Sequence, residues 1–101
     1  MIIIQTTIDE DKKARELINS LLETNKIACG TFHKIQSSYK WKKQIVEEPE
    51  LEISLYTKES LMREVVDIVT QRHSYELPKI TVLEAVYTLP EYDQWVKDST
   101  I

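Results

Sequence analysis

Residues 27–41 read IACGTFHKIQSSYKW, and this stretch decides the fold. The pattern of this stretch has a period of two, which predicts a strand. Every second side chain is then expected on one side of it: Ile27, Cys29, Thr31, His33, Ile35, Ser37, Tyr39 and Trp41. At roughly 3.3 Å per residue such a strand extends about 45 to 50 Å, which is longer than a domain of this size is wide. We therefore expect its distal half to project or bend, and something to cover that half.

The residues that follow predict a hairpin. Lys42 to Pro49 is the expected loop, and aliphatic and other side chains alternate in the returning strand: Leu51, Ile53 and Leu55 against Glu52, Ser54 and Tyr56. A solvated hairpin tip is then the best explanation of the basic cluster formed by Lys40, Lys42 and Lys43.

A strand and a helix are expected upstream of the hairpin. The contiguous β-branched residues Ile2 to Ile4 predict a short strand buried on both faces, as a central strand would be. Asp9 is a suitable N-cap for a helix over about residues 10–24 that ends near Asn25. Its apolar residues fall at helical spacing on one face: Ala14, Leu17, Ile18, Leu21 and Leu22.

A helix, a strand and a short terminal helix are expected after the hairpin. Thr57 is expected to cap a helix that ends near His73, because Pro78 prevents its continuation. A β-rich run from Ile80 to Tyr87 follows, and a short helix over residues 91–97 has Pro90 at its first turn.

The order β, α, β, β, α, β and a terminal helix fits the split βαβ, or ferredoxin-like, motif. We predict an α+β ferredoxin-like sandwich with a long protruding β-hairpin and a short C-terminal helix, as a single domain over residues 1–101. A chain of this length has room for one hydrophobic core.

Composition argues against several classes of function. The formal net charge of -4 makes nucleic acid and anionic lipid poor general partners. Cys29 is the only cysteine, which excludes an internal disulfide, and no apolar run is long enough to span a membrane. Met1 leads directly into a predicted strand, so we expect a cytoplasmic protein without a targeting peptide.

Six separated stretches make the chain recognisable: Thr6-Thr7 with Leu21-Leu22-Glu23, Ala28-Cys29, Tyr39-x-Trp41, Glu50, His73-Ser74-Tyr75-Glu76-x-Pro78, and Tyr92-x-x-Trp95. In this order and spacing they resemble the CutA, or divalent-cation-tolerance, family over nearly the whole chain. The most specific stretch matches the family's His-Pro-Tyr-Glu-x-Pro signature at four positions. The departures are Ser74 in place of proline, Gly30 and Thr31 in place of Val-Asn, and Tyr56 where lysine is common.

The resemblance implies a homotrimer in which hairpin strands of neighbouring subunits pair, and a role in tolerance of copper or other divalent cations. Pairing of this kind would cover the projecting strand. If the lysine that Tyr56 replaces grips an anion or neutralises a carboxylate in relatives, another group must do so here.

Cys29 and His73 are the metal-ligand candidates, because copper and similar cations prefer thiolate and imidazole. His33 lies about 13 Å from Cys29 along an extended strand, so these two cannot chelate one ion within a chain. The acidic run Glu47, Glu48, Glu50 and Glu52 either holds hard cations loosely or is a solvated hairpin. We expect no required cofactor, and at most a weakly bound copper or other divalent cation.

A polar cluster of His73, Tyr75 and Glu76 is the best candidate for a binding site. Alternatively, Tyr75 and Glu76 cap backbone groups and Pro78 fixes the turn. The resemblance suggests that further residues line the same cleft between subunits: Tyr39, Trp41, Glu50, Tyr92 and Trp95.

Three hypotheses follow. The first is a non-catalytic homotrimer for divalent-cation tolerance, acting by weak metal binding or through a partner protein. The second is a small-molecule-sensing trimer that resembles the PII signalling proteins at the level of the fold. The third, an enzyme built on His73 and Glu76, is disfavoured because no nucleophile with an adjacent base is evident.

Overall fold

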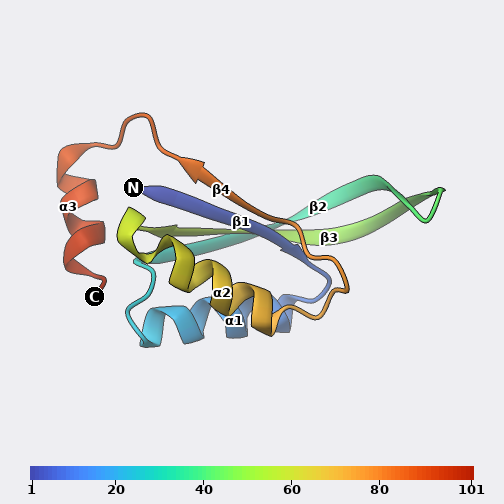
Figure 1. Cartoon of the computed structure of the whole chain (residues 1–101), viewed down its shortest axis with the longest axis horizontal. Helices are drawn as coiled ribbons and strands as arrows, with labels where there is room; N and C mark the ends of the chain where they lie inside the picture. Colours follow the sequence, from blue (N-terminus) through green and yellow to red (C-terminus); the bar gives the residue numbers. More distant parts are fainter.

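The computed structural model describes all 101 residues as a four-stranded antiparallel sheet with helices, in the strand order β2-β3-β1-β4. The elements along the chain are β1 (Ile2–Ile8), α1 (Asp11–Glu23), β2 (Cys29–Trp41), β3 (Gln44–Thr57), the short 3-10 helix η1 (Glu59–Leu61), α2 (Met62–Arg72), β4 (Ile80–Glu84) and α3 (Pro90–Asp98). Figure 1 shows α1 and α2 on one face of the sheet and α3 at the end opposite the hairpin tip. The predicted ferredoxin-like α+β fold is confirmed.

The central strand is β1, as the three isoleucines predict. It pairs with β3 over its whole length and with β4 from Ile2 to Thr6. Ile4 is fully buried, whereas Ile3 faces the other side of the sheet and is half-buried. The strand is therefore more deeply buried on the face that carries the helices.

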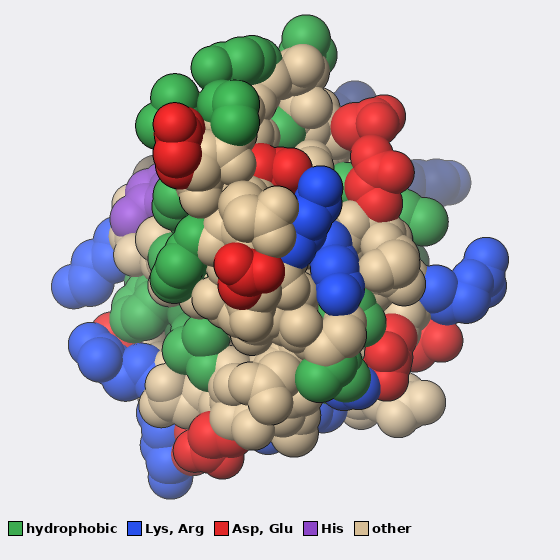
Figure 2. Space-filling view, turned by 90° about the vertical axis from the view of Figure 1, so that its left-hand side faces the viewer, with side chains coloured by type: hydrophobic (Ala, Val, Ile, Leu, Met, Phe, Trp, Pro, Cys, Tyr) green, Lys and Arg blue, Asp and Glu red, His purple; other side chains and the backbone are tan.

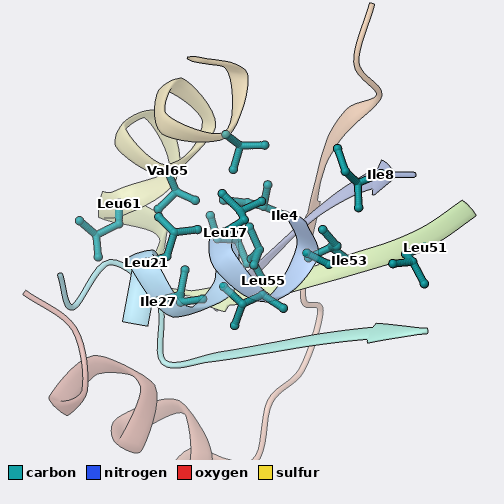
Figure 3. Close-up of a cluster of buried hydrophobic side chains, with 14 residues drawn as sticks. Ile4, Ile8, Leu17, Leu21, Ile27, Leu51, Ile53, Leu55, Leu61 and Val65 are labelled. Atoms are coloured by element: carbon teal, nitrogen blue, oxygen red, sulfur yellow. The ribbon is translucent and has the colours of Figure 1, made fainter. Parts of the chain in front are cut away.

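The core lies between this face and the two helices, where Figure 3 shows aliphatic side chains converging from β1, β3, α1 and α2. Each fully buried Leu or Ile stabilises the fold by about 1.5 to 3 kcal/mol. Gly30 brings α1 close to β2, because a Cβ at this position would lie 2.7 Å from Cγ2 of Ile18. The family departure at Gly30 is thus explained by close packing with Ile18.

The end of α1 is near the predicted residue, and its start differs by a small shift. Asn25 adopts a positive φ of 58°, and the Lys26 N–H donates to the Leu21 carbonyl at 2.9 Å, which is a Schellman arrangement. At the start, Glu10 occupies the N-cap position in place of the predicted Asp9. Asp9 accepts a hydrogen bond from Lys13 at 3.0 Å.

The predicted loop over Lys42 to Pro49 is wrong. Strand β3 begins at Gln44 and pairs in register with β2 through Trp41, so only Lys42 and Lys43 form the turn. Pro49 lies within β3, at a level that β1 does not reach, because β1 pairs with β3 only as far as Leu51. Pro49 therefore has a neighbouring strand on one side only, and a proline is tolerated at such an edge.

The projecting strand is confirmed. Beyond the end of β1, the β2–β3 hairpin extends alone from the body of the molecule (Figure 1). The whole chain, with the hairpin, measures 45 × 27 × 22 Å. Strand β2 itself begins at Cys29, two residues later than the alternation at Ile27 indicates.

Strand β4 is shorter than predicted and ends at Glu84 instead of Tyr87. Ile2, the first residue of β1, pairs with Glu84, and the Ala85 N–H donates to the Met1 carbonyl at 3.1 Å. Residues 85–89 thus extend past the start of β1 and have no partner strand within the chain. None of the helices combines the length and apolar composition that a membrane crossing requires.

The two-residue turn generates a first prediction. Lys42 and Lys43 have φ values of 49° and 66°, a conformation that Asn-Gly adopts with less strain. We expect the double change Lys42→Asn and Lys43→Gly to raise the free energy of unfolding by about 1 to 2 kcal/mol, measured by urea denaturation at fixed protein concentration. The control Lys42→Gln with Lys43→Gln removes the same charges but keeps the strain. Equal stability of the two double variants would contradict the prediction.

Candidate functional site

A pocket of about 600 Å³ lies beside the base of the hairpin, where the connection from α2 to β4 passes the end of β1. Strands β2 and β3 and the connection each contribute side chains to its lining, principally Tyr39, Trp41, Glu48, Glu50, Tyr75 and Glu76. The register pairs Ile35 with Glu50 and Ser37 with Glu48, so the two carboxylates lie on one face of the hairpin. Five of the seven predicted cleft residues therefore share one site.

Glu50 is the most deeply buried charged residue of this site, at 8% exposure. Its Oε2 accepts a hydrogen bond from the Tyr75 hydroxyl at 2.7 Å. Burial, followed by the hydrogen bond to Glu50 and its charge, raises the pKa of the Tyr75 phenol well above its usual range. The phenol is therefore a permanent neutral donor to this carboxylate at physiological pH.

Glu48 has a similar arrangement with Tyr39, whose hydroxyl donates to the Glu48 carboxylate. This hydrogen bond is the largest cause that raises the pKa of Tyr39 to about 12, and the charges of Glu48 and Glu50 add to it. Glu48 and Glu50 are thus each held by a tyrosine, and the neighbouring acidic groups disfavour any further negative charge.

His73 holds Tyr75 in place through a hydrogen bond and a ring contact. Its Nδ1 accepts a hydrogen bond from the Tyr75 backbone N–H at 3.1 Å, so the ring proton belongs on Nε2, which lies 2.8 Å from the Thr7 carbonyl oxygen. The two rings also pack edge to face, with centroids 4.7 Å apart. Both ring nitrogens are engaged within the chain, so His73 orients the site and has no free nitrogen to offer it.

Ser74, which replaces the family's proline, has a contact of its own. Lys13 donates a hydrogen bond to the Ser74 hydroxyl at 3.2 Å and lies 3.0 Å from Asp9. The connection that carries Tyr75 is therefore tied to the start of α1. All of these groups are exposed, so the contribution to stability is small.

The remaining predicted residues form a second group at the other end of the sheet. Tyr92 and Trp95 of α3 pack with ring centroids 5.3 Å apart. Burial and the neighbouring Cys29 and Tyr56 raise the pKa of Tyr92. One chain therefore does not unite Tyr92 and Trp95 with the pocket.

The two predicted metal ligands are also apart. Cys29 pairs with Tyr56, which in turn pairs with Ile3 near the start of β1, whereas His73 contacts Thr7 near its end. Four residues of strand separate these levels by about 13 Å. No group of three or more His, Cys, Asp or Glu side chains in the chain is arranged to hold a metal ion. Metal binding at Cys29 and His73 stays a prediction.

Sequence reasoning missed the separate role of Glu48 and treated it as part of an acidic run. Because residues 42–49 were assigned to a loop, the strand alternation that places Glu48 beside Glu50 was not applied to them. The Thr7 carbonyl that receives the His73 hydrogen bond has no signature in the sequence.

Comparisons with known proteins agree along the whole chain. The family model described as CutA1 divalent ion tolerance protein matches residues 2–99. The divalent-cation tolerance protein CutA of Thermotoga maritima is 34% identical over 101 residues, which is 100% of both chains. The crystal structure of CutA1 from Pyrococcus horikoshii has a TM-score of 0.95 at 28% identity and covers 100% of this chain and 99% of that one. The structure described as the PII-like protein CutA from Nostoc sp. PCC 7120 in apo form has a TM-score of 0.93 at 25% identity, with 100% and 98% covered.

The contact between Tyr75 and Glu50 generates a second prediction. Tyr75→Phe removes the only hydrogen-bond donor to a mostly buried carboxylate, so we expect a loss of about 1 to 3 kcal/mol in the free energy of unfolding. In the Glu50→Gln background the same change should cost clearly less, and a double-mutant cycle by urea denaturation measures the difference. Additive losses would show that the hydrogen bond contributes nothing of its own.

Proposed function

The chain belongs to the family of CutA1 divalent ion tolerance proteins, and on this premise we propose that it acts in tolerance of copper or another divalent cation as a non-catalytic homotrimer. The observation that carries the proposal is that both edges of the sheet, and the apolar segment that follows β4, have no partner within the chain. The cytoplasm is the proposed location.

The two edges of the sheet differ, which favours a ring. The outer edge of β2 offers an unpaired strand of 13 residues, and the outer edge of β4 offers a shorter one. Exposed strand edges invite pairing with another chain. A contact between two different edges is heterologous, and it closes into a ring when its rotation allows. In the proposed ring of three copies, the shorter edge of β4 would cover part of the outer edge of β2 in the next copy.

Apolar side chains mark the same surface. Val86, Tyr87 and Leu89 are 104%, 74% and 58% exposed on the connection between β4 and α3. Figure 2 views this end of the molecule and shows hydrophobic side chains at the top, where the connection runs. Exposed apolar side chains grouped in this way are typical of protein interfaces. A neighbouring subunit is the partner that we propose for them.

We propose that any metal binding is weak and occurs between subunits. A single chain offers no cluster of metal ligands, whereas a subunit contact would bring side chains of a second chain to Cys29. Binding at His73 would require the loss of one of its two hydrogen bonds. Folding would not depend on the metal.

A second candidate function is small-molecule sensing in the manner of PII proteins. The pocket beside the hairpin favours it, because its volume of about 600 Å³ lies within the range of small-molecule sites. The neighbour from Nostoc that is described as PII-like has the same fold. Catalysis by His73 and Glu76 is not proposed, because both nitrogens of His73 are used to hold Thr7 and Tyr75.

Assembly is the first test of the proposed function. We expect light scattering of the pure protein to give the mass of three 11.9 kDa chains, with and without a chelator. Val86→Asp should reduce the mass to that of one chain, because burying an unpaired charge at an interface costs several kcal/mol. The control Met62→Asp places the same charge on the exposed side of α2 and should leave the trimer intact. A monomeric wild-type protein would refute the proposal.

Metal binding is tested separately by calorimetric titration with Cu(II) and Zn(II). We expect weak binding that Cys29→Ala reduces about tenfold or more, since the thiolate is the softest ligand in the chain. His33→Ala is the matched control, because that imidazole is exposed and pairs only with Glu52. A loss in His73→Ala with the trimer intact would make His73 a ligand as well. Unchanged binding in Cys29→Ala would remove Cys29 from the proposed site.

A further inference from the structure

The carboxylates of the hairpin pocket have no basic partner. No lysine, arginine or histidine nitrogen forms an ion pair with Glu48 or Glu50, and each is held by a neutral tyrosine hydroxyl. Oε1 of Glu50 receives no hydrogen bond from the chain, although the residue is only 8% exposed and lines the pocket. Oε1 is not among the buried polar atoms that lack a partner, so it is accessible from the pocket. This oxygen is therefore available to a positively charged ligand.

Aromatic rings stand around the same carboxylates. Tyr39, Trp41 and Tyr75 all line the pocket, and ring faces attract ammonium and guanidinium groups. The Trp41 ring already has a cation near it, since Lys42 Nζ lies 5.9 Å from its centroid. Carboxylates together with aromatic rings are the usual surroundings of an organic cation in a binding site.

The electrostatic effect of the acidic groups is visible in the tyrosines. The charges of Glu48 and Glu50 help to raise the pKa values of both Tyr39 and Tyr75. Lys40 and Lys79 also line the pocket, but both are exposed and neither forms a salt bridge with these glutamates. The carboxylate of Glu50 is thus the buried charge of the pocket, whereas the lysine side chains are exposed.

We propose that the pocket binds a small organic cation, with an ammonium or guanidinium group at Glu50 and an apolar body against the aromatic rings. The proposal rests on the proposed small-molecule role of this site and specifies its ligand class. A bare divalent metal fits less well, because no three His, Cys, Asp or Glu side chains are arranged to hold one and the two tyrosine hydroxyls already donate to the glutamates. The volume of about 600 Å³ also exceeds what a single ion requires.

A series of three probes with one body and different charge tests the inference. Benzylammonium, benzyl alcohol and benzoate are titrated into the wild-type protein by calorimetry, with the oligomeric state checked by light scattering in the same buffer. We expect benzylammonium to bind about tenfold or more tightly than the other two. Equal affinities, or a preference for benzoate, would overturn the proposal.

Two variants locate the binding site. Glu50→Gln removes the buried charge with little change of shape and should weaken benzylammonium binding about tenfold. Glu47→Gln removes the same charge from the opposite face of β3 and should leave binding unchanged. If Glu50→Gln disturbs the fold, Glu48→Gln serves instead, and it should also weaken binding. Equal loss in the Glu47 and Glu50 variants would show a general charge effect and refute the site.

The outcomes separate this inference from the proposed function. A trimer that binds Cu(II) but does not distinguish the three probes would refute the organic-cation site and leave the tolerance function standing. A monomer that still prefers benzylammonium through Glu50 would refute the trimer and support the site. Displacement of benzylammonium by Cu(II), with the same dependence on Glu50, would identify the pocket as the metal site and overturn the proposal.

Discussion

The length of β1 is the constraint on which the rest of the structure depends. This strand of seven residues is paired on both edges, by β3 and by β4, and it holds the sheet together through backbone hydrogen bonds. Where β1 ends at Ile8, the hairpin continues without a third strand and a pocket opens beside it. Where β1 begins at Ile2, β4 loses its partner, and Val86, Tyr87 and Leu89 are exposed just beyond this point. The exposed apolar segment and the proposed binding site thus lie beyond opposite ends of one strand.

The pocket is built from two different kinds of element. Its carboxylates lie on β3, where the register of the hairpin fixes their spacing, and Tyr75 lies on an irregular connection that needs separate support. His73 gives that support through two hydrogen bonds, one to each side of its ring. The imidazole therefore orients Tyr75 in this chain, and its role as a metal ligand stays a prediction. The pocket itself, with its carboxylates and aromatic side chains, is the proposed binding site.

Predictions from local pattern succeeded where a regular periodicity of the side chains continued over many residues. The alternation of the long strand and the helical spacing near the N-terminus both predicted elements that the structure contains. The hairpin loop failed because Pro49 and its acidic neighbours have the composition of a loop. Their strand conformation depends on pairing with residues 36–38, and such pairing is not encoded in composition. Because residues 44–49 were not predicted as a strand, the position of Glu48 and Glu50 on one face of β3 could not be predicted either.

The sequence by itself determined the family, the order of the elements and the central place of β1, because hydrophobic periodicity and a set of spaced motifs are properties of the chain alone. It also named Glu50, Tyr75 and Glu76 as site residues. Only the tertiary structure decided that Tyr92 and Trp95 lie apart from them, and that both nitrogens of His73 are occupied. The reason is that these contacts join residues distant in the chain, such as His73 and Thr7, and hydrogen bonds to backbone carbonyls leave no trace in side-chain identity.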